Sequence, residues 1–141
     1  MNIDVDRLVR LAAGAGDALR ARADELACLR ADLAALDGQT CTGVEYVRRE
    51  AGKPDRLYMN HGTDQACPLH GKPEPGGRLR SYVGSDPDRI AEARAAMALE
   101  KRRADLEREV GTAERGLAAC GNALRHFYGL LGYNDVAMGE W

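Results

Sequence analysis

Two cysteines and two histidines in the middle of the chain are the residue types of a metal site. Cys67 and His70 are separated by two residues, the spacing of a zinc knuckle, within MNHGTDQACPLHGKPEPGG. Cys41 and His61 lie upstream and supply two further side chains of the same kinds. Together they would form a Cys2His2 set that holds one zinc ion per chain. Such a site would fasten a long loop in a module with few apolar residues.

The same segment also permits plainer interpretations. Only the Cys67–His70 pair is tightly spaced, so the favoured alternative is a Pro/Gly-rich loop without a cofactor, holding a buried free cysteine and two surface histidines. A cysteine nucleophile is disfavoured, because Pro68 directly follows Cys67 and no nucleophile elbow accompanies it. No Walker or dinucleotide-binding fingerprint is present. We therefore expect no catalytic residues, no enzyme activity and no small-molecule substrate.

Long helices are predicted on both sides of this segment. Residues 1–38 and 85–132 carry apolar residues at alternating spacings of three and four, which is the pattern of a coiled-coil seam. Asp4 or Asp6 could cap the first helix, and Ser85 or Asp86, followed by Pro87, marks the start of the second. Cys28 and Cys120 fall within these patterns and are expected to pack as small hydrophobes. Neither helix can bury its stripe alone, which predicts an antiparallel hairpin.

Residues 39–84 form an insert of different character. Alternating apolar and polar residues predict three short antiparallel strands at about 42–49, 56–60 and 78–83. The fold class is therefore α+β, a helical hairpin with a small β module between its arms, followed by a tail at 133–141. The alternation is expected to turn the three tyrosines of the strands, Tyr46, Tyr58 and Tyr82, toward the helices, with Arg78 and Arg80 on the solvated face.

One stretch of the insert resembles a known pattern. Tyr46-Val47-Arg48, Gly52-Lys53-Pro54 and Tyr82-Val83-Gly84 are similar to a small β module of uncharacterised proteins from bacterial mobile elements and phages, over about residues 44–90. The cysteines that follow the GKP turn in that module are absent here, and His61-Gly62 follows a strand rather than preceding one. The resemblance implies a bacterial or phage setting and carries no activity with it.

Composition narrows the class of protein further. The formal net charge of -2 argues against general binding of polyanions by the whole chain. No apolar run approaches the roughly 20 residues of a membrane span, and the N-terminus lacks the pattern of a signal peptide. These features predict a cytoplasmic protein that does not associate with membranes.

The preferred functional prediction is non-enzymatic binding of a macromolecule. The helices are expected to associate into a homodimer, most simply a four-helix bundle, through an interface of Leu19, Leu26, Leu33, Leu106, Val110, Leu117, Leu124, Phe127 and Trp141. The insert would present the basic residues Arg48, Arg49, Lys53, Arg56, Arg78 and Arg80 to a partner. A protein partner is favoured, in the setting of a phage or mobile-element inhibitor or adaptor of a host machine such as a CRISPR complex. The alternative is a nucleic-acid-binding protein with a zinc-stapled insert.

Overall fold

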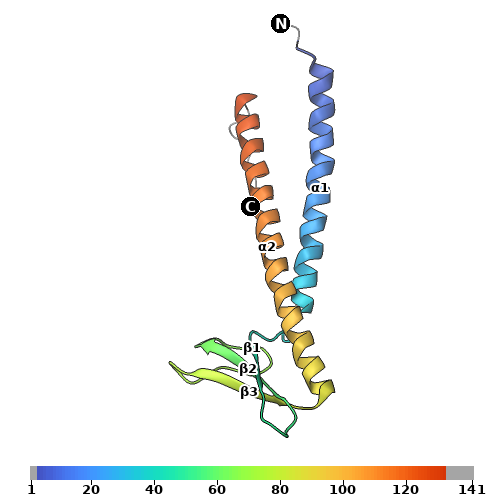
Figure 1. The fold of residues 1–141 in the computed structure, drawn as a ribbon. Coiled ribbons are helices and arrows are strands. Elements are labelled where there is room, and N and C mark those ends of the chain that lie inside the picture. Colours follow the sequence, from blue (N-terminus) through green and yellow to red (C-terminus); the bar gives the residue numbers. More distant parts are fainter. Residues whose placement is uncertain (1–2, 133–141) are drawn as a thin grey trace. The chain divides into compact units, whose positions relative to one another are not determined.

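The α+β architecture is confirmed by a computed structural model, which describes residues 3–132 (Figure 1). The elements follow the order α1 (Val5–Ala35), β1 (Val44–Arg48), β2 (Arg56–Thr63), β3 (Arg78–Gly84) and α2 (Pro87–Leu130). They make up two compact units, one from the chain up to Ala31 with the part from Arg108 onward, and one from Asp32 to Glu107. The first is called the helical unit below, and the second the β unit.

The helical unit contains α1 up to Ala31 and the part of α2 from Arg108 onward, which run antiparallel beside each other (Figure 1). Arg30 of α1 and Glu114 of α2 form an ion pair across them, with Nη2 and Oε1 2.6 Å apart. Leu26 is buried, and other predicted seam residues of this unit are half-buried, namely Leu19, Val110, Leu117 and Leu124. Phe127 is 48% exposed. No helix in the described part of the chain is long and apolar enough to cross a membrane.

Side-chain caps explain where the helices begin. The Asp4 carboxylate accepts the backbone N–H of Arg7, and the Asp86 carboxylate accepts that of Asp88. Both bonds satisfy N–H groups that lack a partner in the first helical turn, so Asp4 and Asp86 are N-caps. Pro87 is the first residue of α2, where its missing N–H costs nothing.

The β unit is an antiparallel three-stranded meander in the order β1-β2-β3. One sheet face carries the buried Leu57 and Met59 of β2 and packs against a cluster from the first turns of α2. Ala96 is buried in that cluster, with Ile90, Ala93 and Met97 partly buried around it. This inner face is a small apolar core, and the metal-type residues lie at its edge, since Cys41 and Cys67 belong to the same cluster.

Two predictions about side-chain placement were wrong. The tyrosines lie on the outer face of the sheet, away from the core, with Tyr46 46% and Tyr82 62% exposed. The inner face is instead filled from β2 by Leu57, Met59 and His61, so cross-strand pairing places Tyr58 and its neighbours outside. Cys28 and Cys120 lie in helices as predicted, but both are exposed. Trp141 and the predicted tail at 133–141 lie outside the described residues.

Candidate metal centre

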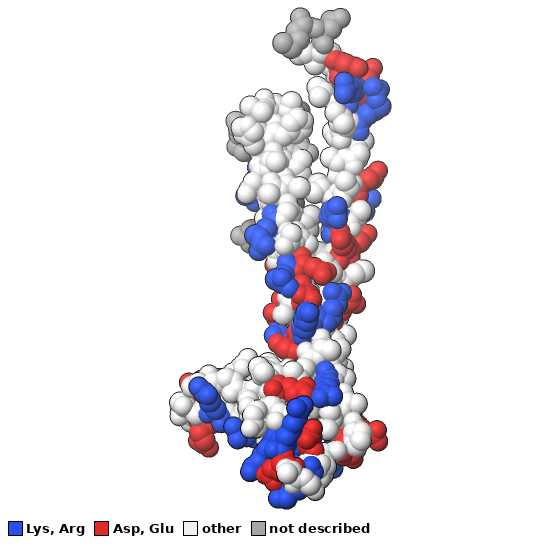
Figure 2. Space-filling view, in the orientation of Figure 1, with Lys and Arg blue, Asp and Glu red and all other residues white. Residues whose placement is uncertain are grey.

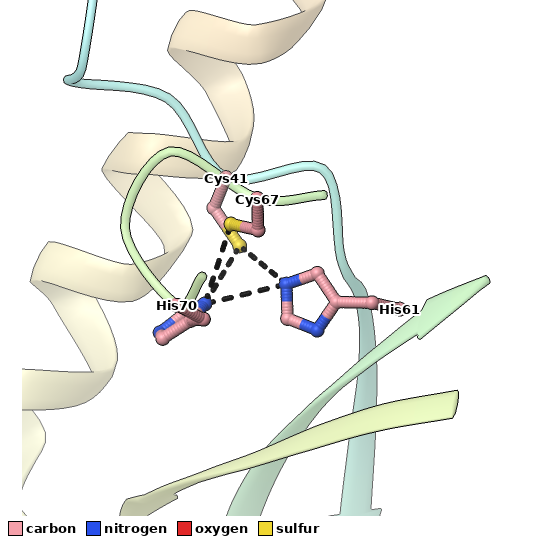
Figure 3. Close-up of side chains that lie close together, drawn as sticks. All are labelled: Cys41, His61, Cys67 and His70. Atoms are coloured by element: carbon pink, nitrogen blue, oxygen red, sulfur yellow. Dashed lines mark hydrogen bonds between the residues drawn. The ribbon is translucent and has the colours of Figure 1, made fainter. Parts of the chain in front are cut away.

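The four side chains singled out from the sequence converge on one point (Figure 3). Cys41 comes from the segment that leads into β1, His61 from β2, and Cys67 and His70 from the connection between β2 and β3. Their ligand atoms all lie within 4.8 Å of one another. Cys41 and His61 are 2% exposed and Cys67 is 3% exposed. The expectation of two surface histidines is therefore wrong for His61, while His70 is half-buried.

Four of the six separations between the ligand atoms match those of a tetrahedral site. The Cys41 Sγ atom lies 3.6 Å from both His61 Nε2 and His70 Nδ1. His70 Nδ1 lies 3.5 Å from Cys67 Sγ and 3.3 Å from His61 Nε2. Around a zinc ion with bonds of about 2.3 Å to sulfur and about 2.05 Å to nitrogen, ideal S···N and N···N edges are about 3.55 Å and 3.35 Å.

Hydrogen bonding alone does not explain this convergence. A ring nitrogen has one lone pair or one proton, so it makes a single good hydrogen bond. His70 Nδ1 nevertheless faces three ligand atoms at 3.3 to 3.6 Å. An ion at the centre of the group would satisfy all four atoms together. The arrangement therefore could bind a metal such as zinc, and two thiolates would balance the charge of a divalent ion in this buried position.

Neighbouring groups orient the candidate ligands. His61 Nδ1 lies 3.2 Å from the carbonyl oxygen of Leu79, which accepts a hydrogen bond from the Nδ1–H group and leaves Nε2 free to face the cysteines. Gly43 donates its N–H to Cys41 Sγ at 3.4 Å. A Cβ on Gly43 would lie 3.0 Å from His61 Nε2, so the glycine also leaves room for that ring. The sequence alone did not reveal the roles of Gly43 and Leu79, because a lone glycine and a backbone carbonyl carry no spacing signal.

The long connection between β2 and β3 is organised by its own hydrogen bonds. Cys67 and Gly71 exchange two backbone bonds of 2.8 Å, which close a tight turn and bring His70 back beside Cys67. Gly71 has a φ of 84°, a conformation that favours glycine. Asp64 Oδ1 accepts the N–H of Gly76 at 2.8 Å and ties the two ends of the connection. The turn thus presents the Cys-x-x-His pair as a single unit.

The two thiols differ in acidity. Burial raises the pKa of Cys41 above its ordinary value. Burial also acts to raise the pKa of Cys67, but backbone N–H groups, including those of Thr42, His70 and Leu69, outweigh it and lower this pKa to about 6. Cys67 is therefore largely a thiolate near pH 7, which is the form that binds metal ions.

The site is joined to the first part of α2. The N–H of Cys41 donates to the carbonyl oxygen of Ala96 at 3.1 Å. Close by in the sequence, Glu45 of β1 accepts two hydrogen bonds from Arg94, of 3.0 and 2.6 Å. These contacts fix the segment that carries Cys41 against the helix, and Thr42 joins the same segment to the β2–β3 connection by donating its hydroxyl to the carbonyl oxygen of Ala66 at 3.4 Å.

The predicted basic residues separate into two groups. Arg49 and Lys53 lie in or beside the β1–β2 turn and pair with Asp55 and Glu50 respectively. The others lie on the strands, at Arg48, Arg56, Arg78 and Arg80. Of these, Arg48 also pairs with Glu50, at 2.8 Å. The structure thus pairs Arg48 with Arg56 across β1 and β2, sets Arg78 and Arg80 elsewhere on the sheet, and gives the basic residues of the turn acidic partners.

Comparison with known proteins finds no matching family model, no matching curated protein and no matching solved structure.

Proposed function

We propose that the β unit is a zinc-stapled module and that the chain acts as a non-enzymatic binding protein. The observation that carries this proposal is the convergence of the ligand atoms of Cys41, His61, Cys67 and His70 at tetrahedral distances. Four protein ligands would complete the shell of a zinc ion and leave no position for a reacting water. Such closed sites are structural, whereas catalytic zinc sites keep a position open.

A structural ion suits the small core of this unit. Leu57 and Met59 are the large side chains buried within the sheet, at 1% and 0% exposed. A hydrophobic core of this size rarely stabilises a fold without a bound metal, a disulfide or a partner chain. Zinc would join the segment before β1, the end of β2 and the β2–β3 connection at one point. The remaining surface of the module would then be free to bind a partner.

Self-association of the helices is a second part of the proposal. Several large apolar side chains of the helical unit are more than half exposed, among them Leu8, Val9, Leu11 and Leu130. Contiguous exposed apolar surface commonly marks an interface. A homodimer would cover these residues in a four-helix bundle. The phage or mobile-element setting, including inhibition of a CRISPR complex, stays a prediction from the sequence.

Native mass spectrometry of the protein purified without chelator tests both parts. We expect a dimer carrying one zinc ion per chain, and loss of the zinc in Cys67→Ser. Cys28→Ser is the matched control, because Cys28 is exposed and outside the ligand group. A metal-free mass, or zinc retained in full by Cys67→Ser, would overturn the zinc-stapled module. A monomer at micromolar concentration would overturn the dimer and leave the zinc result standing.

A further inference from the structure

The outer face of the sheet has a regular composition. Strand alternation places Val44, Tyr46 and Arg48 of β1 on it, with Arg56, Tyr58 and Asn60 of β2 and Arg78, Arg80 and Tyr82 of β3. The registers Tyr46↔Tyr58 and Tyr58↔Tyr82 set the three tyrosines side by side across the sheet. Asn60↔Arg80 and Arg48↔Arg56 lie in the rows on either side. The row of aromatic rings is thus flanked by arginines on both sides.

The three tyrosine rings form an aromatic platform in which neighbouring rings are tilted by 51° and 48° to each other. Their centroids are 6.3 Å apart between Tyr46 and Tyr58, and 5.1 Å apart between Tyr58 and Tyr82. The two outer rings are also the most exposed, on the two edge strands of the sheet. Val44 is the aliphatic residue of this face, so its apolar area is almost entirely aromatic. The tyrosines contact one another and Arg80, while the apolar core lies on the opposite face of the sheet.

The charged residues at the outward positions of the three strands are all arginines, and one of them, Arg48, pairs with Glu50 just beyond β1. No acidic residue occupies an outward position of the three strands, and Glu45 points to the inner side, where it binds Arg94. The Arg80 guanidinium lies 5.6 Å from the Tyr46 ring centroid and 5.9 Å from that of Tyr58. Its Nε donates to Asn60 Oδ1 at 3.0 Å, which holds the cation over the platform. Figure 2 shows basic side chains over the region of the sheet, with acidic ones among them.

We infer that this outer face binds single-stranded nucleic acid, with bases stacked on Tyr46, Tyr58 and Tyr82 and phosphates contacted by Arg56, Arg78 and Arg80. Stacking needs unpaired bases, because the rings lie on an open sheet and cannot reach bases inside a duplex. The flanking arginines supply the attraction for the sugar-phosphate backbone. The inference deepens the proposed function and depends on it, since zinc is proposed to hold β1, β2 and the β2–β3 connection in this arrangement.

The test is fluorescence anisotropy of labelled 12-nucleotide dT and rU probes with the zinc-loaded full chain, at 50 and 200 mM salt. Tyr82→Ala and Tyr46→Ala should each weaken binding by about 5- to 140-fold, the loss of one stacked base. Tyr82→Phe should bind like the wild type, because stacking uses the ring and not the hydroxyl. Arg80→Ala should weaken binding and reduce the salt slope by about 0.7, one phosphate contact on a single strand.

Two controls separate this face from general effects. Tyr128→Ala removes an exposed tyrosine and Arg20→Ala an exposed arginine, both from the helical unit. Neither should change affinity for the probes. All variants are compared at equal zinc content and equal far-ultraviolet circular dichroism, so a variant that fails to fold is recognised.

The possible results all bear on the inference. No binding of either probe at 100 μM zinc-loaded protein would overturn it, as would an equal loss in Tyr128→Ala and Tyr82→Ala. Tighter binding of a 12-base-pair duplex than of the single strands would also overturn it. If polyglutamate displaces the probe from the wild type and Tyr82→Ala binds normally, the face is a patch for acidic protein and the inference is wrong. Tyrosine-dependent binding by protein that lacks zinc would support the nucleic-acid site and overturn the proposal that zinc holds the sheet in its binding arrangement.

Discussion

Replacing Cys67 by serine should unfold the β unit at a much lower temperature. The substitution changes one atom of a side chain that is 3% exposed and keeps the local backbone hydrogen bonds possible. It replaces a thiol whose pKa is about 6 by a hydroxyl that does not ionise near neutral pH. The remaining Cys41, His61 and His70 are three ligands in a site shaped for four. We therefore expect the variant to lose its zinc.

The size of the effect follows from linkage between zinc binding and folding. Structural zinc sites bind with about 10 to 16 kcal/mol at pH 7. At about 10 μM free zinc, this stabilises the folded form by about 3 to 9 kcal/mol. The β unit, Asp32–Glu107, falls in the size range where 1 kcal/mol shifts the midpoint by about 4 to 8 °C. Cys67→Ser should therefore lower the unfolding midpoint by at least about 12 °C.

The assay is thermal unfolding by circular dichroism at 10 μM free zinc, with the metal content measured in the same samples. Excess chelator added to the wild type should produce a decrease of similar size, because it removes the same ion. Cys28→Ser should unfold at the wild-type temperature. Equal midpoints for Cys67→Ser and Cys28→Ser, together with no response of the wild type to chelator, would refute the reasoning from the ligand geometry.

Three further predictions concern residues around the site and the core. Gly43→Ala should weaken zinc affinity by about 10- to 100-fold in a competition titration, because the added Cβ would lie 3.0 Å from His61 Nε2. Unchanged affinity would show that the His61 ring can shift freely. Met59→Ala should destabilise the β unit by about 2 to 5 kcal/mol in urea unfolding, since Met59 is fully buried, and a cost below 1 kcal/mol would contradict that packing. Glu100→Gln should cost about 1 kcal/mol at pH 7, because two hydrogen bonds from Arg103 lower the pKa of Glu100. Because the pKa of Glu100 is lowered in the folded state, its ionised form stabilises the fold at pH values above the ordinary pKa of 4.5. The stability difference between Glu100→Gln and the wild type should therefore disappear as the pH falls below 4.5. A difference that stays constant with pH would exclude this cause.

The helices and strands were predictable because their patterns are local. Apolar spacing of three and four residues and the caps at Asp4 and Asp86 set the helices, whose observed bounds, Val5–Ala35 and Pro87–Leu130, lie close to the prediction. β2 extends to Thr63, beyond the predicted end at residue 60, since His61 continues the buried alternation of the strand.

The orientation of the sheet was not predictable from alternation. The alternation of side chains along a strand places Tyr58 on the opposite face from Leu57 and Met59, but it does not determine which of the two faces packs against the helix. In the fold, the larger aliphatic content of the Leu57 face decides, and it packs against Ile90 and Ala96.

The candidate ligand set was predictable as a list of residues, but its geometry was not. Cys67 and His70 have a recognisable spacing, whereas Cys41 joins them through the bond from its N–H to Ala96, the pairing of β1 with β2 and the bond from Thr42 to Ala66. These are tertiary contacts between segments far apart in the sequence. Gly43 and the Leu79 carbonyl act on the ligands through the same tertiary contacts, so no local pattern could have indicated them.

The spacing of the ligands along the chain has a consequence for the order of folding. His61 and His70 are 9 residues apart and Cys67 lies between them, whereas Cys41 is 20 residues from His61. Closing the longer loop costs about 0.7 kcal/mol more chain entropy than closing the shorter one. Zinc bound first by His61, Cys67 and His70 would give a folding intermediate in which the β2–β3 connection is closed but β1 has not yet docked. We therefore expect two kinetic phases when unfolded protein meets zinc, with the slower phase absent in Cys41→Ser.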